Sequence, residues 1–143
     1  MLINLKQILD MAEEGGYAIP AFNVYNMETV MGIIRAAEEA KSPVIIQSYS
    51  RLFTNEEGYF VSPIILAAAK RASVPVCFHL DHGAGKTEVI RALRYGASGI
   101  MIDNSNLPFD ENKKATKEVV EICGAVGIPV EGELGHIGSV NDA

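Results

Sequence analysis

The sequence predicts an α/β fold whose strands form a parallel sheet. Short apolar runs typical of buried strands alternate along the 143 residues with amphipathic stretches of helical spacing. A Pro-Val pair opens three of the apolar runs, at Pro43, Pro75 and Pro129, which indicates a weakly repeated strand–helix unit. Proline is tolerated at the first residue of a parallel strand, because the hydrogen-bond ladder has not yet begun there.

The N-terminal region supplies the first helix and the first strand. Apolar residues from Leu5 to Ala12 recur with helical spacing, and Gly15-Gly16 ends this helix. The apolar run over 18–24 is the first predicted strand.

The next segment contains the second helix and the second strand. Asn26 is suited to cap the N-terminus of the helix that follows it. Residues 43–47 form a near-continuous apolar run, which is typical of a strand buried on both faces. The polar stretch over 48–58 is predicted to be turn-like.

The remaining elements continue the same alternation. We predict a helix over 60–72 with Pro63 in its first turn, where proline is tolerated. A strand over 74–80, a helix over 86–95, a strand over 98–102, a helix over 108–126 and a strand over 129–133 follow.

Two architectures fit this alternation. A doubly wound sheet of five strands suits the length, whereas a (β/α)8 barrel suits the local pattern but takes about 250 residues. No predicted strand is followed by a GxGxxG or Walker sequence, which argues against a nucleotide-binding version of either fold.

Composition narrows the class of partner. The net charge of −6 argues against nucleic acid or a polyanionic membrane as partner, but it allows a small phosphate ester. Cys77 and Cys123 each sit in an apolar run, so we expect two buried thiols in a reducing compartment. The N-terminus does not resemble a signal peptide, and no apolar stretch reaches the length of a membrane span. We therefore expect a soluble cytoplasmic protein.

Polar side chains gather where the predicted strands end. They are Asn23, Gln47 to Ser50, His79 to His82, Asp103 to Ser105, and Glu131 to Glu133 followed by His136. The carboxyl ends of parallel strands meet at one edge of a sheet, so we expect these groups on a common rim. Carboxylates and imidazoles on such a rim can bind a divalent metal or transfer protons.

Each group also has a plainer interpretation. The two histidines of His79-Leu80-Asp81-His82 could cap the following helix, and Asp103 could be an ordinary turn aspartate. Glu131 and Glu133 would point to the same side of a strand, which is costly without a cation unless one of them faces solvent. We expect His136 to be an exposed loop residue.

The motifs together resemble one known family. They are Ala21-Phe22-Asn23, Ser42 to Gln47, His79-Leu80-Asp81-His82, Met101 to Ser105 with Leu107-Pro108-Phe109, Glu111-Asn112 and Val130 to Gly135. In order and spacing they resemble the N-terminal half of class II, zinc-dependent fructose-bisphosphate and tagatose-bisphosphate aldolases. The resemblance implies that residues 1–143 are the N-terminal portion of one TIM-barrel domain, with about five of its parallel strands.

The resemblance also implies roles for individual residues in a zinc-dependent cleavage of a phosphorylated ketose. His82 matches a catalytic Zn²⁺ ligand, and Asp81 matches the acid/base that moves the proton of the C4 hydroxyl. Asp103 and Glu133 match residues that hold the metal in an alternative, buried position. Asn23 matches a residue that orients substrate near the metal.

Three positions depart from the family pattern. Tyr49 stands where a small residue or Ser is usual, Asn104 replaces a common Gly, and Asn141 stands where an acidic residue is frequent. These departures concern the contact to one phosphate and the chemistry of the last loop.

The resemblance covers only the first part of the family's barrel. The parts of the site that it does not include are two further zinc-ligand histidines and the groups that bind the phosphates. We therefore expect a truncated chain that is inactive alone and that self-associates or forms homo-oligomers through open sheet edges. The alternatives are a non-enzymatic half-barrel that binds metal or phosphate, an unrelated flavodoxin-like binding domain, and an aldolase for a related phosphorylated sugar acid.

Overall fold

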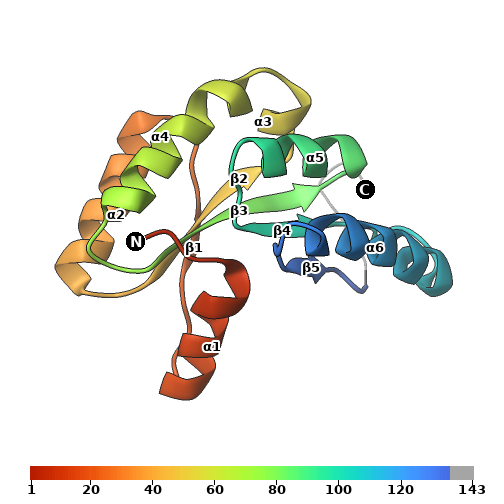
Figure 1. Cartoon of the computed structure of the whole chain (residues 1–143), viewed down its shortest axis with the longest axis horizontal. Coiled ribbons are helices and arrows are strands. Elements are labelled where there is room, and N and C mark those ends of the chain that lie inside the picture. Colours follow the sequence, from red (N-terminus) through yellow and green to blue (C-terminus); the bar gives the residue numbers. More distant parts are fainter. Residues whose placement is uncertain (136–143) are drawn as a thin grey trace, which may run out of the picture.

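The strands of this protein, seen in a computed structural model that describes residues 1–135, lie side by side in the order in which they occur along the chain. All neighbouring strands are parallel, and the sheet order is β1-β2-β3-β4-β5 (Figure 1). A doubly wound sheet reverses its strand order at a switch point, whereas a barrel adds each strand beside the previous one. The sequential order therefore confirms the partial-barrel prediction over the doubly wound alternative.

Six helices and five strands are described within residues 1–135. They are α1 (Leu5–Gly15), β1 (Ala21–Asn23), α2 (Met27–Ala40), β2 (Val44–Tyr49), α3 (Arg51–Thr54), α4 (Glu57–Arg71), β3 (Val76–Gly83), α5 (Lys86–Arg94), β4 (Gly99–Ile102), α6 (Phe109–Gly124) and β5 (Val130–Gly132). The predicted asparagine cap is confirmed, because the Asn26 side chain accepts a hydrogen bond from the backbone N–H of Thr29 at 3.0 Å.

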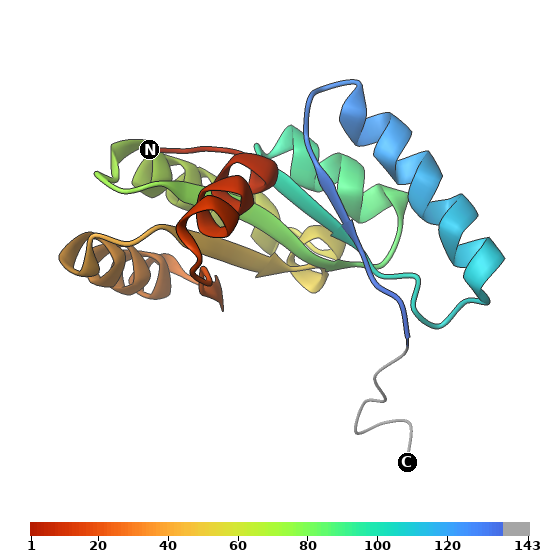
Figure 2. The same ribbon diagram turned by 90° about the horizontal axis from the view of Figure 1, so that it is seen from below.

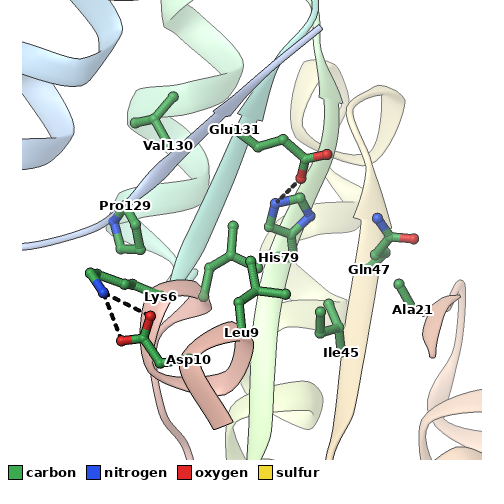
Figure 3. Close-up of a pocket in the computed structure, with 11 residues that line it drawn as sticks. Lys6, Leu9, Asp10, Ala21, Ile45, Gln47, His79, Pro129, Val130 and Glu131 are labelled. Carbon is green, nitrogen blue, oxygen red and sulfur yellow. Dashed lines mark hydrogen bonds and ion pairs between the residues drawn. The ribbon is translucent and has the colours of Figure 1, made fainter. Parts of the chain in front are cut away.

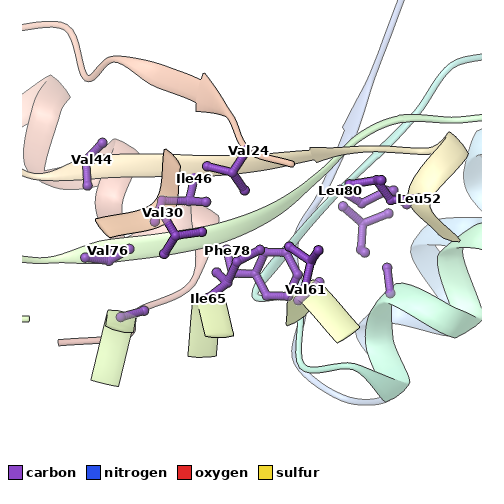
Figure 4. Packing of buried hydrophobic residues seen from close by; sticks show 14 of the residues in the cluster. Val24, Val30, Val44, Ile46, Leu52, Val61, Ile65, Val76, Phe78 and Leu80 are labelled. Atoms are coloured by element: carbon purple, nitrogen blue, oxygen red, sulfur yellow. The ribbon is translucent and has the colours of Figure 1, made fainter. Parts of the chain in front are cut away.

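The main hydrophobic core lies between the sheet and the helices on its outer face. Val76, Phe78 and Leu80 alternate along β3 and point into this core, where they pack with residues of α2, α4 and α5 (Figure 4). Phe78 is completely buried. The helices α2, α4, α5 and α6 therefore cover one face of the sheet, as the outer helices of a barrel do.

The opposite face of the sheet is covered at one end by α1 (Figure 2). Leu5 and Ile8 of this helix pack against Ile45 and Cys77, the residues that alternate with the outer core positions. Period-two alternation thus gives β2 and β3 an outer apolar face and an inner face that turns polar toward the ends of the strands.

The segment over 48–58 differs from its predicted turn-like structure. The second strand continues to Tyr49, a short helix occupies Arg51–Thr54, and α4 begins at Glu57. Gly58 lies in the first turn of α4, and a Cβ at this position would meet the backbone carbonyl oxygen of Leu52 at 2.7 Å. This glycine permits a close helix–helix approach rather than ending a helix.

The placement of Pro63 in the first helical turn was also wrong. Because α4 starts earlier than predicted, Pro63 lies inside it. A proline at this depth removes one backbone hydrogen bond, which the burial of Val61 and Ile65 on the same helix offsets.

Both cysteines are free and buried, as predicted. Burial raises the pKa of the Cys77 thiol to about 11, so that thiol is protonated at neutral pH. Among the described residues, no helix combines the length and the hydropathy that crossing a membrane requires.

Candidate metal and acid/base site

The predicted polar rim exists at the carboxyl ends of the strands. Asn23 is the last residue of β1, and Asp81 and His82 lie near the end of β3. Asp103 and Glu133 each follow the last residue of their strand by one position. The structure brings all five of these predicted residues to the same edge of the sheet.

Asp81 is held by two amide side chains from neighbouring strands. Asn23 donates from Nδ2 to Oδ2 of Asp81 at 2.7 Å, and Gln47 donates from Nε2 to Oδ1 at 3.2 Å. Both carboxylate oxygens are thereby fixed, and the side chain is 13% exposed. The role of Gln47 as a partner of Asp81 was not predicted, although its position two residues after Ile45 places it on the inner face.

His82 lies within β3 rather than at the start of a loop, which corrects the predicted end of this strand. The pairing of β3 with β4 shifts between Leu80 and Gly83, so three steps along β3 match two along β4. His82 has a positive φ of 47° in this irregular stretch, a conformation that is uncommon for a residue other than glycine. The bulge turns the imidazole toward the ends of β4 and β5.

One imidazole and two carboxylates converge at this point. His82 Nδ1 is 2.8 Å from Oδ2 of Asp103 and 3.6 Å from Oε2 of Glu133. One ligand atom from each residue can be chosen so that the three atoms lie within 4.8 Å of one another. Nitrogen and carboxylate oxygen are donors suited to Zn²⁺ and related divalent cations, so the donor set fits such a metal.

The local electrostatics are those of an acidic cluster around a histidine. Burial alone would lower the pKa of His82, but the hydrogen bond to Asp103 and the charges of Asp81, Asp103 and Glu133 outweigh it and raise that pKa. Burial pushes the pKa of Asp103 upward, yet hydrogen bonds from Ser105 and His82 lower it overall. A cation at this position would replace the proton on His82 as the partner of the carboxylates.

A second polar pair lies on the inner face below this cluster. His79 is 1% exposed, and its Nε2 is 3.3 Å from Oε2 of Glu131, a close contact whose alignment is poor for a hydrogen bond. The pair borders an open hollow of about 540 Å³, which Leu5 and Leu9 of α1 also line (Figure 3). The alternative that His79 caps the following helix does not hold, because its ring lies beside Gly99 of β4 and faces Glu131 of β5.

Comparison with known proteins agrees with this arrangement. The family model for class II fructose-bisphosphate aldolase matches residues 3–143. The chain belongs to the class II fructose-bisphosphate aldolase family. A fructose-bisphosphate aldolase from Thermus caldophilus is 42% identical to it over 142 residues, which cover 99% of this chain and 46% of that protein.

Solved aldolase structures have the same fold over this region. The YdjI aldolase from Escherichia coli K12 is 41% identical with a TM-score of 0.90, and the match covers 99% of this chain and 55% of that one. A fructose-bisphosphate aldolase from Campylobacter jejuni is 27% identical with a TM-score of 0.80, over 94% of this chain and 48% of that one. The chain thus spans about half the length of the aldolases it matches.

Tyr49 stands beside His82. Its ring and that of His82 meet edge to face, with centroids 6.3 Å apart and planes inclined by 61°. Tyr49 pairs with Asp81 in the register of β2 and β3, so it lies at the mouth of the site. His136 and Asn141, which were also discussed from the sequence, lie outside the described residues.

Proposed function

We propose that this chain is the N-terminal portion of a single TIM-barrel domain that catalyses a class II aldolase reaction. The reaction is the reversible cleavage of fructose 1,6-bisphosphate or tagatose 1,6-bisphosphate into dihydroxyacetone phosphate and glyceraldehyde 3-phosphate. The observation that carries the proposal is the fixed carboxylate of Asp81 directly beside the cluster of His82, Asp103 and Glu133. Family membership supports the same reaction.

Three residues of this chain would hold Zn²⁺. His82 offers an imidazole nitrogen, and Asp103 and Glu133 offer carboxylate oxygens, all from one small region. When bound, the metal would supply Lewis-acid polarisation of the ketose carbonyl. The two carboxylates also offset the positive charge of the cation, which a single histidine could not do.

Asp81 is the proposed acid/base. In the cleavage direction it accepts the proton of the C4 hydroxyl while the bond between C3 and C4 breaks, and in the synthetic direction it returns that proton. A proton-transfer group must keep a defined orientation, and the amides of Asn23 and Gln47 provide it by holding both carboxylate oxygens. Asn23 also lies at the rim, where it can contact the substrate hydroxyl.

The cysteines and the sheet edges bear on the proposed compartment and on the proposed assembly of the chain. Two free, buried cysteines are compatible with the reducing cytoplasm. Within the described residues, β1 and β5 are the outer strands of the sheet, so each has one unpaired edge. We propose that these edges are covered by self-association or by further parallel strands of the barrel.

A chimera tests the proposed function. Residues 1–143 are fused to the complementary C-terminal part of the Thermus caldophilus aldolase, and cleavage of both bisphosphates is measured with added Zn²⁺. Asp81→Ala should lower kcat about 100-fold or more with KM nearly unchanged, whereas Asp110→Ala on the exposed start of α6 serves as the control. Chelation should abolish turnover. A folded, metal-loaded chimera that cleaves neither substrate would favour the non-enzymatic half-barrel or an aldolase for another sugar phosphate.

A further inference from the structure

The three proposed metal ligands keep their positions at the edge of the sheet only if hydrogen bonds fix the backbone of each one. His82 lies inside β3, where the ladder and the bulge fix it. Asp103 is beyond β4, but its N–H donates to the carbonyl oxygen of Gly83 at 3.0 Å. Glu133 is beyond β5, whose ladder to β4 ends at the pair Ile102–Gly132. The sheet therefore does not hold Glu133.

The anchor for Glu133 comes from α6. Asn112 is 4% exposed, and its Nδ2 donates to the backbone carbonyl oxygen of Glu133 at 2.8 Å. Asn112 lies in the first turn of the amphipathic helix α6, and a buried amide there is costly unless both of its polar ends have partners. The partner of the Asn112 amide nitrogen is therefore Glu133, the proposed metal ligand that follows β5.

Thr116 satisfies the other end of this amide. Its hydroxyl donates to Oδ1 of Asn112 at 3.0 Å and accepts a longer hydrogen bond from Nδ2 of Asn104 at 3.5 Å. This pattern orients the Asn112 amide, because its oxygen faces a donor and its nitrogen is left to face Glu133. Thr116 also packs against β5, since a Cβ on Gly132 would lie 3.3 Å from its Cγ2.

We infer that Asn112, oriented by Thr116, is a positioning residue that sets the backbone of Glu133 and thereby the place of its carboxylate beside His82. Asn104 follows Asp103 directly, so the chain of contacts from Asn104 through Thr116 and Asn112 joins the segments that carry both carboxylates. The inference rests on the proposed metal site and concerns how that site is held, not which reaction it supports. It predicts that two side chains which touch neither metal nor substrate control metal affinity.

The test is metal binding by the 143-residue chain itself, with Co²⁺ as a spectroscopic probe and Zn²⁺ by calorimetry. Thr116→Val removes the hydroxyl and keeps the shape, and Asn112→Leu removes the donor. Both should weaken metal binding about tenfold and shift the Co²⁺ absorption spectrum toward that of Glu133→Gln, which lacks the carboxylate directly. Thr116→Ser keeps the hydroxyl and should restore wild-type affinity and spectrum. Thr87→Val on the exposed face of α5 is the matched control.

The outcomes separate this inference from the proposed function. If the wild-type chain binds metal and Glu133→Gln weakens binding, but Thr116→Val has wild-type affinity and spectrum, the inference alone is overturned. If the wild-type chain binds no metal, the inference and the proposed metal site fall together. Should Asn112→Leu not fold, the comparison of Thr116→Val with Thr116→Ser still decides the matter.

Discussion

The amide of Asn23 and the carboxylate of Asp81 are 58 positions apart in the sequence, and the structure joins them by a 2.7 Å hydrogen bond across the inner face of the sheet. Asn23 lies on β1 and Asp81 on β3, so this contact reaches across β2. Gln47 of β2, which lies between them, donates the second amide hydrogen bond to Asp81. Three consecutive strands thus contribute one side chain each to a single oriented carboxylate. This relationship gives the Asp81 carboxylate a fixed orientation, which its proposed role in proton transfer requires.

Removal of the Asn23 amide should impair turnover more than binding. A hydrogen bond to a charged group contributes about 1.5–3 kcal/mol, so we expect Asn23→Ala to lower kcat of the chimeric aldolase about tenfold or more. The exposed Asn106→Ala is the control. Steady-state kinetics of the two variants would contradict this account if Asn23→Ala retained the wild-type kcat.

The alternation of β3 predicts which phenylalanine supports the fold. Phe78 is completely buried beneath the outer helices, whereas Phe60 on α4 is 64% exposed. Phe78→Ala should lower the free energy of unfolding by about 3–5 kcal/mol, and Phe60→Ala by about 1 kcal/mol or less. Urea titrations of both variants measure this difference, and equal losses would mean that the outer core is misassigned.

Gly83, at the bulge of β3, should tolerate replacement by alanine poorly. A Cβ on Gly83 would meet the carbonyl oxygen of Met101 at 2.6 Å, whereas a Cβ on Gly32 of α2 would meet nothing within 4 Å. Gly83→Ala should therefore destabilise the protein by about 1–3 kcal/mol. Gly32→Ala should stabilise it by about 0.5–1 kcal/mol, since alanine favours a helix interior. If thermal melts show that both substitutions change the stability in the same direction, the close approach of Gly83 to Met101 is refuted.

Acid should weaken the fold partly through Glu131. The contact with His79 lowers the pKa of Glu131 in the folded state, against a smaller opposing effect of burial. A carboxyl with a lowered folded pKa adds stability above its unfolded pKa, and that stability is lost as the pH falls through the folded pKa. His79→Leu removes both the hydrogen-bond donor and the imidazole, so its free energy of unfolding should decline less between about pH 6 and pH 3. Identical pH profiles for the wild-type chain and His79→Leu would exclude this coupling.

Much of the candidate site could be predicted from the sequence, because its residues come directly after the apolar runs that form the strands. Asp103 and Glu133 could be placed on the rim because the residues before them form strands and parallel strands share an edge. The bulge at His82 could not be predicted, since it depends on the register between β3 and β4. The hydrogen bond from Gln47 to Asp81 could not be predicted either, because it depends on the register between β2 and β3.

The missed helical features have a related cause. Gly58 signals a helix break in sequence, yet in the structure it allows two helices to touch. Asn112 has the polarity of an exposed position on α6, and only the packing of α6 on β5 reveals that it is buried. Local patterns describe elements well, whereas contacts between elements are set by tertiary packing.

Zinc titration of the 143-residue chain tests the central claim most directly. One imidazole and two carboxylates of the described residues lie close enough to share one metal ion. We predict that the wild-type chain binds Zn²⁺ weakly and that His82→Ala abolishes this binding, while Glu118→Gln on α6 leaves it unchanged. Tight, stoichiometric Zn²⁺ binding that survives His82→Ala in calorimetry would contradict the account.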